Sequence, residues 1–233
     1  MKNGQTEQRK LFKEVLKRFQ KAGILESVIL IGSWCIPLYK KYFEELKTVS
    51  PMRTRDMDFL VPLDAKFENK VDIAALLKDL GFKTVFQGQH GYMRLVQPYL
   101  ILEFLVAEKG RGTEKPYNLS ALSVNAQRLR MLDMLTEETI QIEVDGIEII
   151  LPHPVLFALH KLTISSRRSG KNKIEKAGKD KKVAIEILRA FVKEKYSAQI
   201  RGIFNSLHKN RQKEIITILN KENEEMILNI LKS

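Results

Sequence analysis

The feature that most constrains this chain is a change of hydrophobic periodicity at Pro152. Before this residue, short apolar runs of the strand type alternate with helical patterns, and after it only helical patterns remain. Strands followed by a run of helices are typical of an α+β protein or of two separate domains. The sequence therefore predicts a mixed-sheet domain over residues 1–152 and an all-helical domain over 153–233.

The expected elements follow from apolar spacing and from turn residues. Helices are predicted where apolar residues recur every three or four positions: 6–22, 34–46, 71–80, 120–135, 154–166, 180–196, 198–208, 211–220 and 222–232. Strands are predicted at 27–31, 56–62, 83–87, 91–96, 99–106, 139–144 and 147–151, of which the last two form a hairpin around Asp145 and Gly146. The basic segment 165–179 is expected to be a loop.

The positive charge of the chain is concentrated in its second part. Residues 1–152 carry 22 Lys and Arg against 20 Asp and Glu, a net charge of +2, whereas residues 153–233 carry 18 against 8, a net of +10. Such a region suits nucleic acid, nucleotide phosphates or an acidic partner. A solvated, lysine-rich helical surface is the alternative interpretation.

Composition also indicates a cellular compartment. No apolar run approaches the roughly 20 residues that span a bilayer, and the polar N-terminus lacks the apolar centre of a signal peptide. Cys35 is the only cysteine, so no internal disulfide can form. We therefore expect a cytoplasmic protein without a membrane partner, and the sequence does not indicate an oligomeric state.

Three carboxylates lie on segments with strand patterns. Asp56 and Asp58 are two residues apart, so their side chains would point to the same face of a strand and could share Mg²⁺ ions. Glu103 lies inside the apolar run 99–106, where a carboxylate is costly unless it faces solvent, a cation or a metal. An aspartate pair in a loop and an outward-facing glutamate are the ordinary alternatives.

Gly32 and Ser33 follow the first predicted strand and precede a helix. Glycine permits close approach of a phosphate to the backbone, and the N–H groups at a helix start attract anions. Ser33 could equally be only the N-cap of that helix.

Taken in this order, the residues resemble the polymerase-β-type nucleotidyltransferase superfamily. Its pattern is Gly-Ser, then Asp-x-Asp on a strand, then one carboxylate on a later strand. The string RTRDMDF at Arg53–Phe59 is similar to many prokaryotic members, and the later strings His160–Leu162, Arg167–Arg168 and Lys179–Asp180 resemble a branch that includes the abortive-infection-type nucleotidyltransferase toxins. One departure is the gap between Ser33 and Asp56, which is longer than is usual in the superfamily.

The resemblance implies an activity. Asp56 and Asp58 would bind two Mg²⁺ ions, with Mn²⁺ as a substitute, and Glu103 would bind the second metal and help to deprotonate an acceptor hydroxyl. Gly32 and Ser33 would hold the β- and γ-phosphates of an NTP such as ATP, and pyrophosphate would leave. The acceptor could be RNA, tRNA in particular, a small molecule or a protein. A catalytically idle fold that binds nucleic acid or a protein partner is the alternative.

Two residues of the second part complete the expected site. Lys161 lies on the first helix of that part, where it would act as a point charge on the triphosphate. Asp180 is expected at a helix start, where it would cap free N–H groups and orient a basic partner. A surface lysine and an ordinary cap are the alternative for this pair.

Overall fold

The chain divides into two compact units in a computed structural model. The structure describes residues 2–51, 54–89, 91–113, 115–167, 171–192 and 194–233, so Arg53 and Arg168 lie outside the described residues. A sheet unit comprises Met1–Cys35 and Met52–Leu151, and a helical unit comprises Ile36–Pro51 and Pro152–Ser233. The units are thus not contiguous in sequence, because the segment 36–51 packs with the helices.

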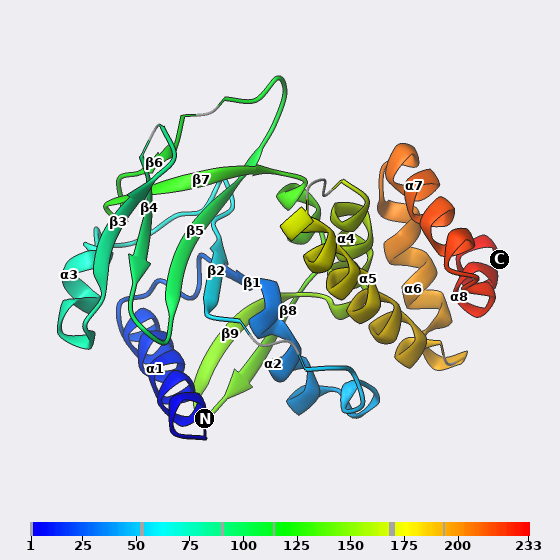
Figure 1. The fold of residues 1–233 in the computed structure, drawn as a ribbon, viewed down its shortest axis with the longest axis horizontal. Coiled ribbons are helices and arrows are strands. Elements are labelled where there is room, and N and C mark those ends of the chain that lie inside the picture. Colours follow the sequence, from blue (N-terminus) through cyan, green and yellow to red (C-terminus); the bar gives the residue numbers. More distant parts are fainter. Residues whose placement is uncertain (1, 52–53, 90, 114, 168–170, 193) are drawn as a thin grey trace. The chain divides into compact units, whose positions relative to one another are not determined.

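The sheet unit is built on a mixed, seven-stranded sheet. Its main path has the strand order β1-β2-β5-β4-β3, and β7 pairs with both β5 and β6 (Figure 1). The strands are β1 Ile29–Ile31, β2 Asp56–Leu60, β3 Lys83–Gln87, β4 Tyr92–Val96, β5 Ile101–Glu108, β6 Tyr117–Leu119 and β7 Val124–Arg130. Strand β5 is parallel to β2 and β7 and antiparallel to β4. The expectation of an α+β protein with a mixed sheet is confirmed.

The two faces of the central strands differ because side chains alternate along each strand. Met57 and Phe59 of β2 are buried, and the Phe59 ring contacts Phe104 of β5 at 5.7 Å between ring centroids. Phe19 of α1 (Lys2–Lys21) packs against both rings, at 5.2 and 6.0 Å. One face is therefore closed by α1, and the alternate residues of β2 lie on the other face.

A separate hairpin lies beside α1. Strands β8 (Thr139–Val144) and β9 (Ile147–Pro152) pair as predicted, and the turn residues Asp145 and Gly146 both have positive φ angles, 57° and 76°. Gln20 of α1 donates a hydrogen bond to the carbonyl of Gly146 at 3.1 Å. The strong turn signal Asp-Gly therefore correctly located this hairpin.

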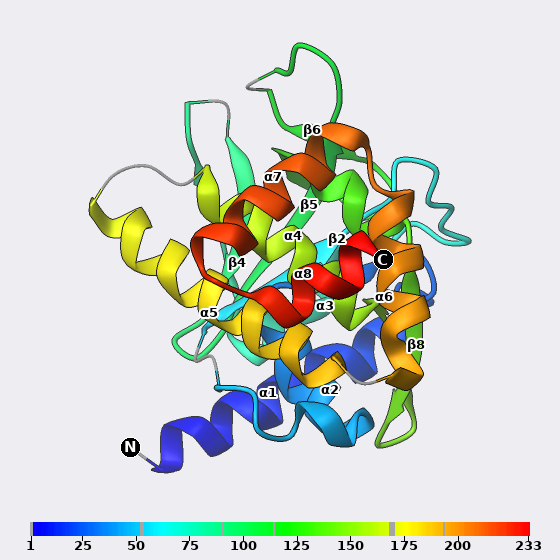
Figure 2. The same ribbon diagram turned by 90° about the vertical axis from the view of Figure 1, so that its right-hand side faces the viewer.

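The helical unit is arranged around one buried helix. Helix α4 has eleven of its thirteen residues buried, and α5, α6 and α7 contact it (Figure 2). The helices after the sheet are α4 Pro154–Ser166, α5 Lys171–Phe191, α6 Glu194–Ser206, α7 Lys209–Lys221 and α8 Glu225–Lys232. The described residues after Pro152 contain no strand, as the sequence predicted.

The segment 36–51 joins the helical unit through specific contacts. It contains most of α2 (Cys35–Tyr42) and the short 3-10 helix Glu44–Leu46. Tyr39 donates a hydrogen bond to the carbonyl of Pro152 at 2.6 Å, and Ser50 donates one to Glu186 at 2.8 Å. Most of the long segment between Ser33 and Asp56 therefore belongs to the helical unit.

Two of the predicted elements are wrong. The segment 120–135 contains strand β7 and a 3-10 helix (Leu132–Thr136) rather than one long helix, because β7 pairs with β5 and overrides helix-forming side chains. Positive φ angles at Ser123 and Met131 bracket this strand. The predicted loop 165–179 is largely helix α5, whose exposed turns are supported by pairs such as Glu175–Lys179.

Most other helical elements match within a few residues, but the predicted helix 180–196 belongs to α5 (Lys171–Phe191), which starts nine residues earlier and ends five residues earlier. The predicted helix 71–80 consists of α3 (Ile73–Leu77) and a 3-10 turn (Lys78–Leu80), and Gly81 ends it in the left-handed conformation. Within the described residues, no helix has the length and apolar character needed to cross a bilayer.

Candidate active site

Asp56 and Asp58 lie on the face of β2 that α1 does not cover. Both are partly exposed, whereas Met57 and Phe59 between and after them are buried. The backbone N–H of Asp56 donates to Thr54 Oγ1 at 3.0 Å, which fixes the chain at the start of the strand. The apolar alternate positions thus bury one face and turn both carboxylates to the other.

Glu103 lies beside Asp58 on the neighbouring strand. Strands β2 and β5 run parallel with Asp58 opposite Glu103, so the two side chains share a face. The Glu103 side chain is 17% exposed, and Leu102 and Phe104 on either side of it are buried. The structure therefore brings Asp56, Asp58 and Glu103 onto one face of two adjacent strands.

The Gly32-Ser33 pair lies against the second aspartate. Ile31 is the partner of Asp58 in the antiparallel β1–β2 pairing, and Gly32 follows with a φ of +76°. A Cβ atom on Gly32 would lie only 2.5 Å from Asp58 Oδ2, so a larger residue here would displace the Asp58 carboxylate and strain the left-handed backbone. The long gap before Asp56 therefore does not separate Gly32 from the carboxylates.

Ser33 is not the N-cap of the helix, which was the alternative interpretation of this residue. The helical turn begins two residues before the predicted start at residue 34, as a 3-10 helix over Gly32–Trp34, and Ile31 occupies the N-cap position without a side-chain cap. Helix α2 then continues from Cys35. The left-handed conformation of Gly32 accounts for this early start, because it turns the chain directly out of β1.

An arginine that the sequence analysis missed contacts two of the carboxylates. Arg94 of β4 lies opposite Glu103 in the β4–β5 pairing, and its Nε forms an ion pair with Glu103. Its Nη2 lies 3.5 Å from Asp56 Oδ1, and Nη1 donates to Gln87 Oε1 at 3.0 Å. The sequence contains one signal for this residue, a positively charged side chain inside the otherwise apolar strand run YMRLV.

The side chains on this face suit a divalent metal by their chemistry. Carboxylate oxygens are the ligands that Mg²⁺ prefers, and the absent side chain of Gly32 leaves room for the Asp58 carboxylate beside the backbone. Within the described ranges, no three His, Cys, Asp or Glu side chains already converge as a metal site. Arg94 contacts both Asp56 and Glu103, so its charge compensates these carboxylates in the present arrangement.

Lys161 and Asp180 lie in the helical unit and bind each other. Lys161 Nζ on α4 donates to Asp180 Oδ1 on α5 at 2.8 Å, and the two side chains are 8% and 0% exposed. Asp180 is not at a helix start, because α5 begins at Lys171 and continues to Phe191. The interpretation of Asp180 as a helix cap is therefore wrong, and the pair is a buried ion pair.

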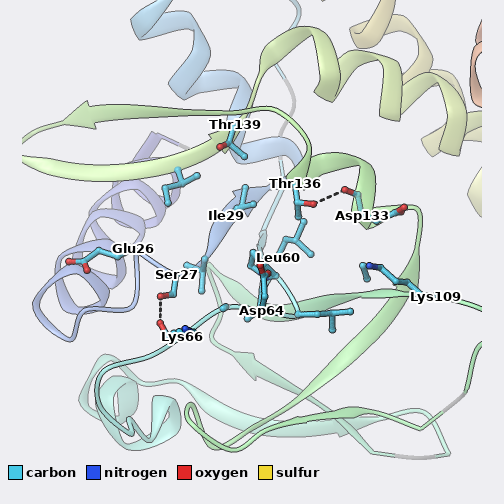
Figure 3. A pocket seen from close by; sticks show the side chains of 17 residues that line it. Glu26, Ser27, Ile29, Leu60, Asp64, Lys66, Lys109, Asp133, Thr136 and Thr139 are labelled. Atoms are coloured by element: carbon cyan, nitrogen blue, oxygen red, sulfur yellow. Dashed lines mark hydrogen bonds between the residues drawn. The ribbon is translucent and has the colours of Figure 1, made fainter. Parts of the chain in front are cut away.

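A large cavity lies on the carboxylate face of the sheet unit, beyond the carboxylates. Its volume is about 950 Å³, and Leu60 and Ala107 form part of its wall (Figure 3). Leu60 follows Asp58 by two residues on the same face of β2, a distance of roughly 7 Å along the strand. Lys66, Lys109 and Asp133 are among its polar lining residues.

Comparison with known proteins identifies the family of the chain. The family model described as "Nucleotidyltransferase" matches residues 10–208. The chain belongs to this nucleotidyltransferase family. The matched range includes every site residue named above, from Gly32 to Asp180.

A solved structure resembles this family member in fold. An antigenic nucleotidyltransferase-like protein from Paracoccidioides brasiliensis is 15% identical, with 95% of this chain and 92% of that chain covered at a TM-score of 0.51. The antibiotic-resistance factor ANT(2'')-Ia is 14% identical, with 83% of this chain and 95% of that chain covered at a TM-score of 0.40. No curated protein matches the sequence. At 15% identity the likeness to the Paracoccidioides protein shows the fold alone.

Proposed function

We propose that the protein is a metal-dependent enzyme that transfers a nucleoside monophosphate from an NTP to an acceptor hydroxyl. The observation that carries this proposal is the shared face of Asp56, Asp58 and Glu103, with the Gly32 backbone against Asp58. Membership of a nucleotidyltransferase family supports it independently. Three carboxylates beside one arginine form an acidic site, which a protein that only binds nucleic acid does not need.

The residues have distinct roles in this mechanism. Asp56 and Asp58 would hold two Mg²⁺ ions, for which Mn²⁺ could substitute, and the bound metal would neutralise charge on the attacking and leaving oxygens. Gly32 and Ser33 would bind the β- and γ-phosphates through backbone N–H groups at the start of the 3-10 helix. Glu103 would accept the proton of the acceptor hydroxyl, whose oxygen attacks the α-phosphorus in line as pyrophosphate leaves.

The experiment that tests the proposal is a transfer assay with α-labelled NTPs. The protein is incubated with Mg²⁺, each NTP, and either total RNA or a small-molecule extract, and Asp58→Asn protein is the control. The proposal predicts a labelled acceptor and pyrophosphate release in the wild type only. Label in neither fraction, or equal label with Asp58→Asn, would favour the catalytically idle alternative.

We propose RNA, tRNA in particular, as the acceptor, on the basis of the net charge of +10 in residues 153–233. Counterion release requires that RNA affinity fall steeply as salt rises. Fluorescence anisotropy with labelled tRNA at increasing salt measures this. An absence of binding at low salt would point instead to a small-molecule acceptor. Growth arrest on expression would support the relation to the toxin branch.

A further inference from the structure

Arg94 is placed by the sheet itself at the centre of the carboxylate face. It lies opposite Glu103 in the β4–β5 pairing, and Met93 and Leu95 on either side of it are buried. Alternation along β4 therefore fixes its side chain on the same face as Glu103. Only 18% of the side chain is exposed, so its charge acts in a partly desolvated environment.

The guanidinium is held by one neutral anchor and faces two carboxylates. Gln87 Oε1 accepts from Arg94 Nη1 at 3.0 Å and from Tyr92 Oη at 3.1 Å, which attaches the arginine to the β3–β4 hairpin. On its other side, Nη2 lies 3.5 Å from Asp56, and Nε forms an ion pair with Glu103 that lacks hydrogen-bond alignment. The neutral anchor would remain intact if both carboxylates turned away.

A metal ion would need the oxygens that Arg94 contacts. A guanidinium does not lose its proton in proteins, so Arg94 cannot yield these oxygens by becoming neutral. The oxygens become available only if the guanidinium and the carboxylates move apart. The Arg94 guanidinium and a metal ion therefore compete for the same oxygens of Asp56 and Glu103.

We propose that Arg94 is an internal counter-cation, which positions Asp56 and Glu103 in the metal-free protein and is displaced from them when a divalent cation binds. This inference rests on the proposed function of the carboxylates as metal ligands. It assigns Arg94 a positioning role, because the arginine acts through the carboxylates. A purely structural ion pair would instead stabilise the fold equally with and without metal.

The test is Mn²⁺ binding to the full chain without nucleotide, measured by electron paramagnetic resonance. Arg94→Met should bind Mn²⁺ about tenfold more tightly than the wild type. The Mn²⁺ affinity of Arg94→Lys should lie between those two, because lysine keeps the positive charge but lacks the planar set of N–H donors of the guanidinium. Arg18→Met is the matched control, since Arg18 pairs with Asp79 in the same unit away from these carboxylates. Its Mn²⁺ affinity should equal that of the wild type.

A second readout separates competition from structure. In the metal-free state Arg94→Met should melt below the wild type, and saturating Mn²⁺ should raise its melting temperature more than that of the wild type. Unchanged or weaker Mn²⁺ binding by Arg94→Met would overturn the role of Arg94 while the metal site itself stands. Unchanged Mn²⁺ binding by Asp58→Asn would overturn the metal site, and the inference with it.

Discussion

Two groups of charged side chains in the protein differ in exposure and in charge balance. On the sheet, three carboxylates share one face, and Arg94 pairs with two of them. In the helical unit, Lys161 and Asp180 form a pair of one cation and one anion that is almost fully buried. The first group has a net negative charge, whereas the charges of Lys161 and Asp180 balance each other.

This difference indicates which group can take up a ligand. Surplus carboxylates in a partly exposed place attract a cation, whereas a buried pair is already compensated and excludes water. The sequence predicts one site that includes Asp56, Asp58, Glu103, Lys161 and Asp180. In the structure, the three carboxylates form an acidic face within the sheet unit, and Lys161 and Asp180 form a buried ion pair within the helical unit.

The largest effect expected from the comparison concerns the sheet carboxylates. Asp56→Ala or Asp58→Ala should lower the rate of nucleotide transfer by several orders of magnitude, because metal placement fails. The free energy of unfolding should change by less than about 1 kcal/mol, since a partly exposed carboxylate is removed. Initial rates with α-labelled NTP and urea unfolding measure the two quantities.

Asp64→Ala is the matched control for these variants, because Asp64 is an exposed aspartate of the same unit that lines the cavity. Its transfer rate should remain near that of the wild type. Near-wild-type turnover by Asp56→Ala or Asp58→Ala would remove the basis for treating the sheet face as the active site.

The next effect should appear in stability rather than in turnover. Lys161→Ala leaves the fully buried Asp180 without its cation, and we expect a loss of about 3–5 kcal/mol in the free energy of unfolding. The double variant Lys161→Met/Asp180→Leu should recover most of it, because both charges are gone. Urea denaturation of the three proteins measures this.

The NTP affinity of the same double variant tests whether Lys161 and Asp180 have only a structural role. If the variant is as stable as the wild type but binds NTP at least tenfold more weakly, roughly 1.4 kcal/mol, Lys161 contacts the triphosphate as the sequence suggested. Unchanged affinity would restrict the pair to a structural role.

Local patterns explain how much of the fold could be predicted. Strand β2 and the hairpin at Asp145-Gly146 were predicted correctly, because the alternation of apolar residues and the Asp-Gly pair are local patterns. Strand β7 could not be predicted, because its conformation depends on pairing with β5 from a distant part of the chain. The segment 36–51 likewise belongs to the helical unit through long-range contacts such as Tyr39 with Pro152.

The same limit applies to the candidate site. Alternation was enough to predict that Asp56 and Asp58 share a face, since both lie on one strand. The contact of Arg94 with Glu103 needs the register between two strands, and the pairing of Lys161 with Asp180 needs the packing of α4 on α5. Neither can be read from residue spacing. The early start of α5 further obscured the position of Asp180.

A smaller effect should make the helical unit sensitive to acid. His153 is 4% exposed and caps α4, where its Nδ1 accepts from the N–H of Val155 at 3.2 Å. Burial lowers the pKa of His153 from 6.5 to about 4. Since the unfolded chain binds this proton first, stability should fall as the pH falls from 6.5 to 4, by on the order of 3 kcal/mol.

His153→Asn keeps a residue that can cap the helix and removes the titration. Urea unfolding at pH 7 and pH 4 should therefore show a smaller loss of stability in the variant than in the wild type. An identical pH dependence in the two proteins would mean that His153 does not remain neutral in the fold.

The most direct test of the acidic face is the effect of NTP on the melting temperature with and without Mg²⁺. We predict that an NTP raises the melting temperature of the wild type only when Mg²⁺ is present, and that Asp58→Asn abolishes this increase. An NTP that stabilises the wild type equally without metal, or that stabilises Asp58→Asn as much as the wild type, would contradict a metal-dependent nucleotide site on the sheet.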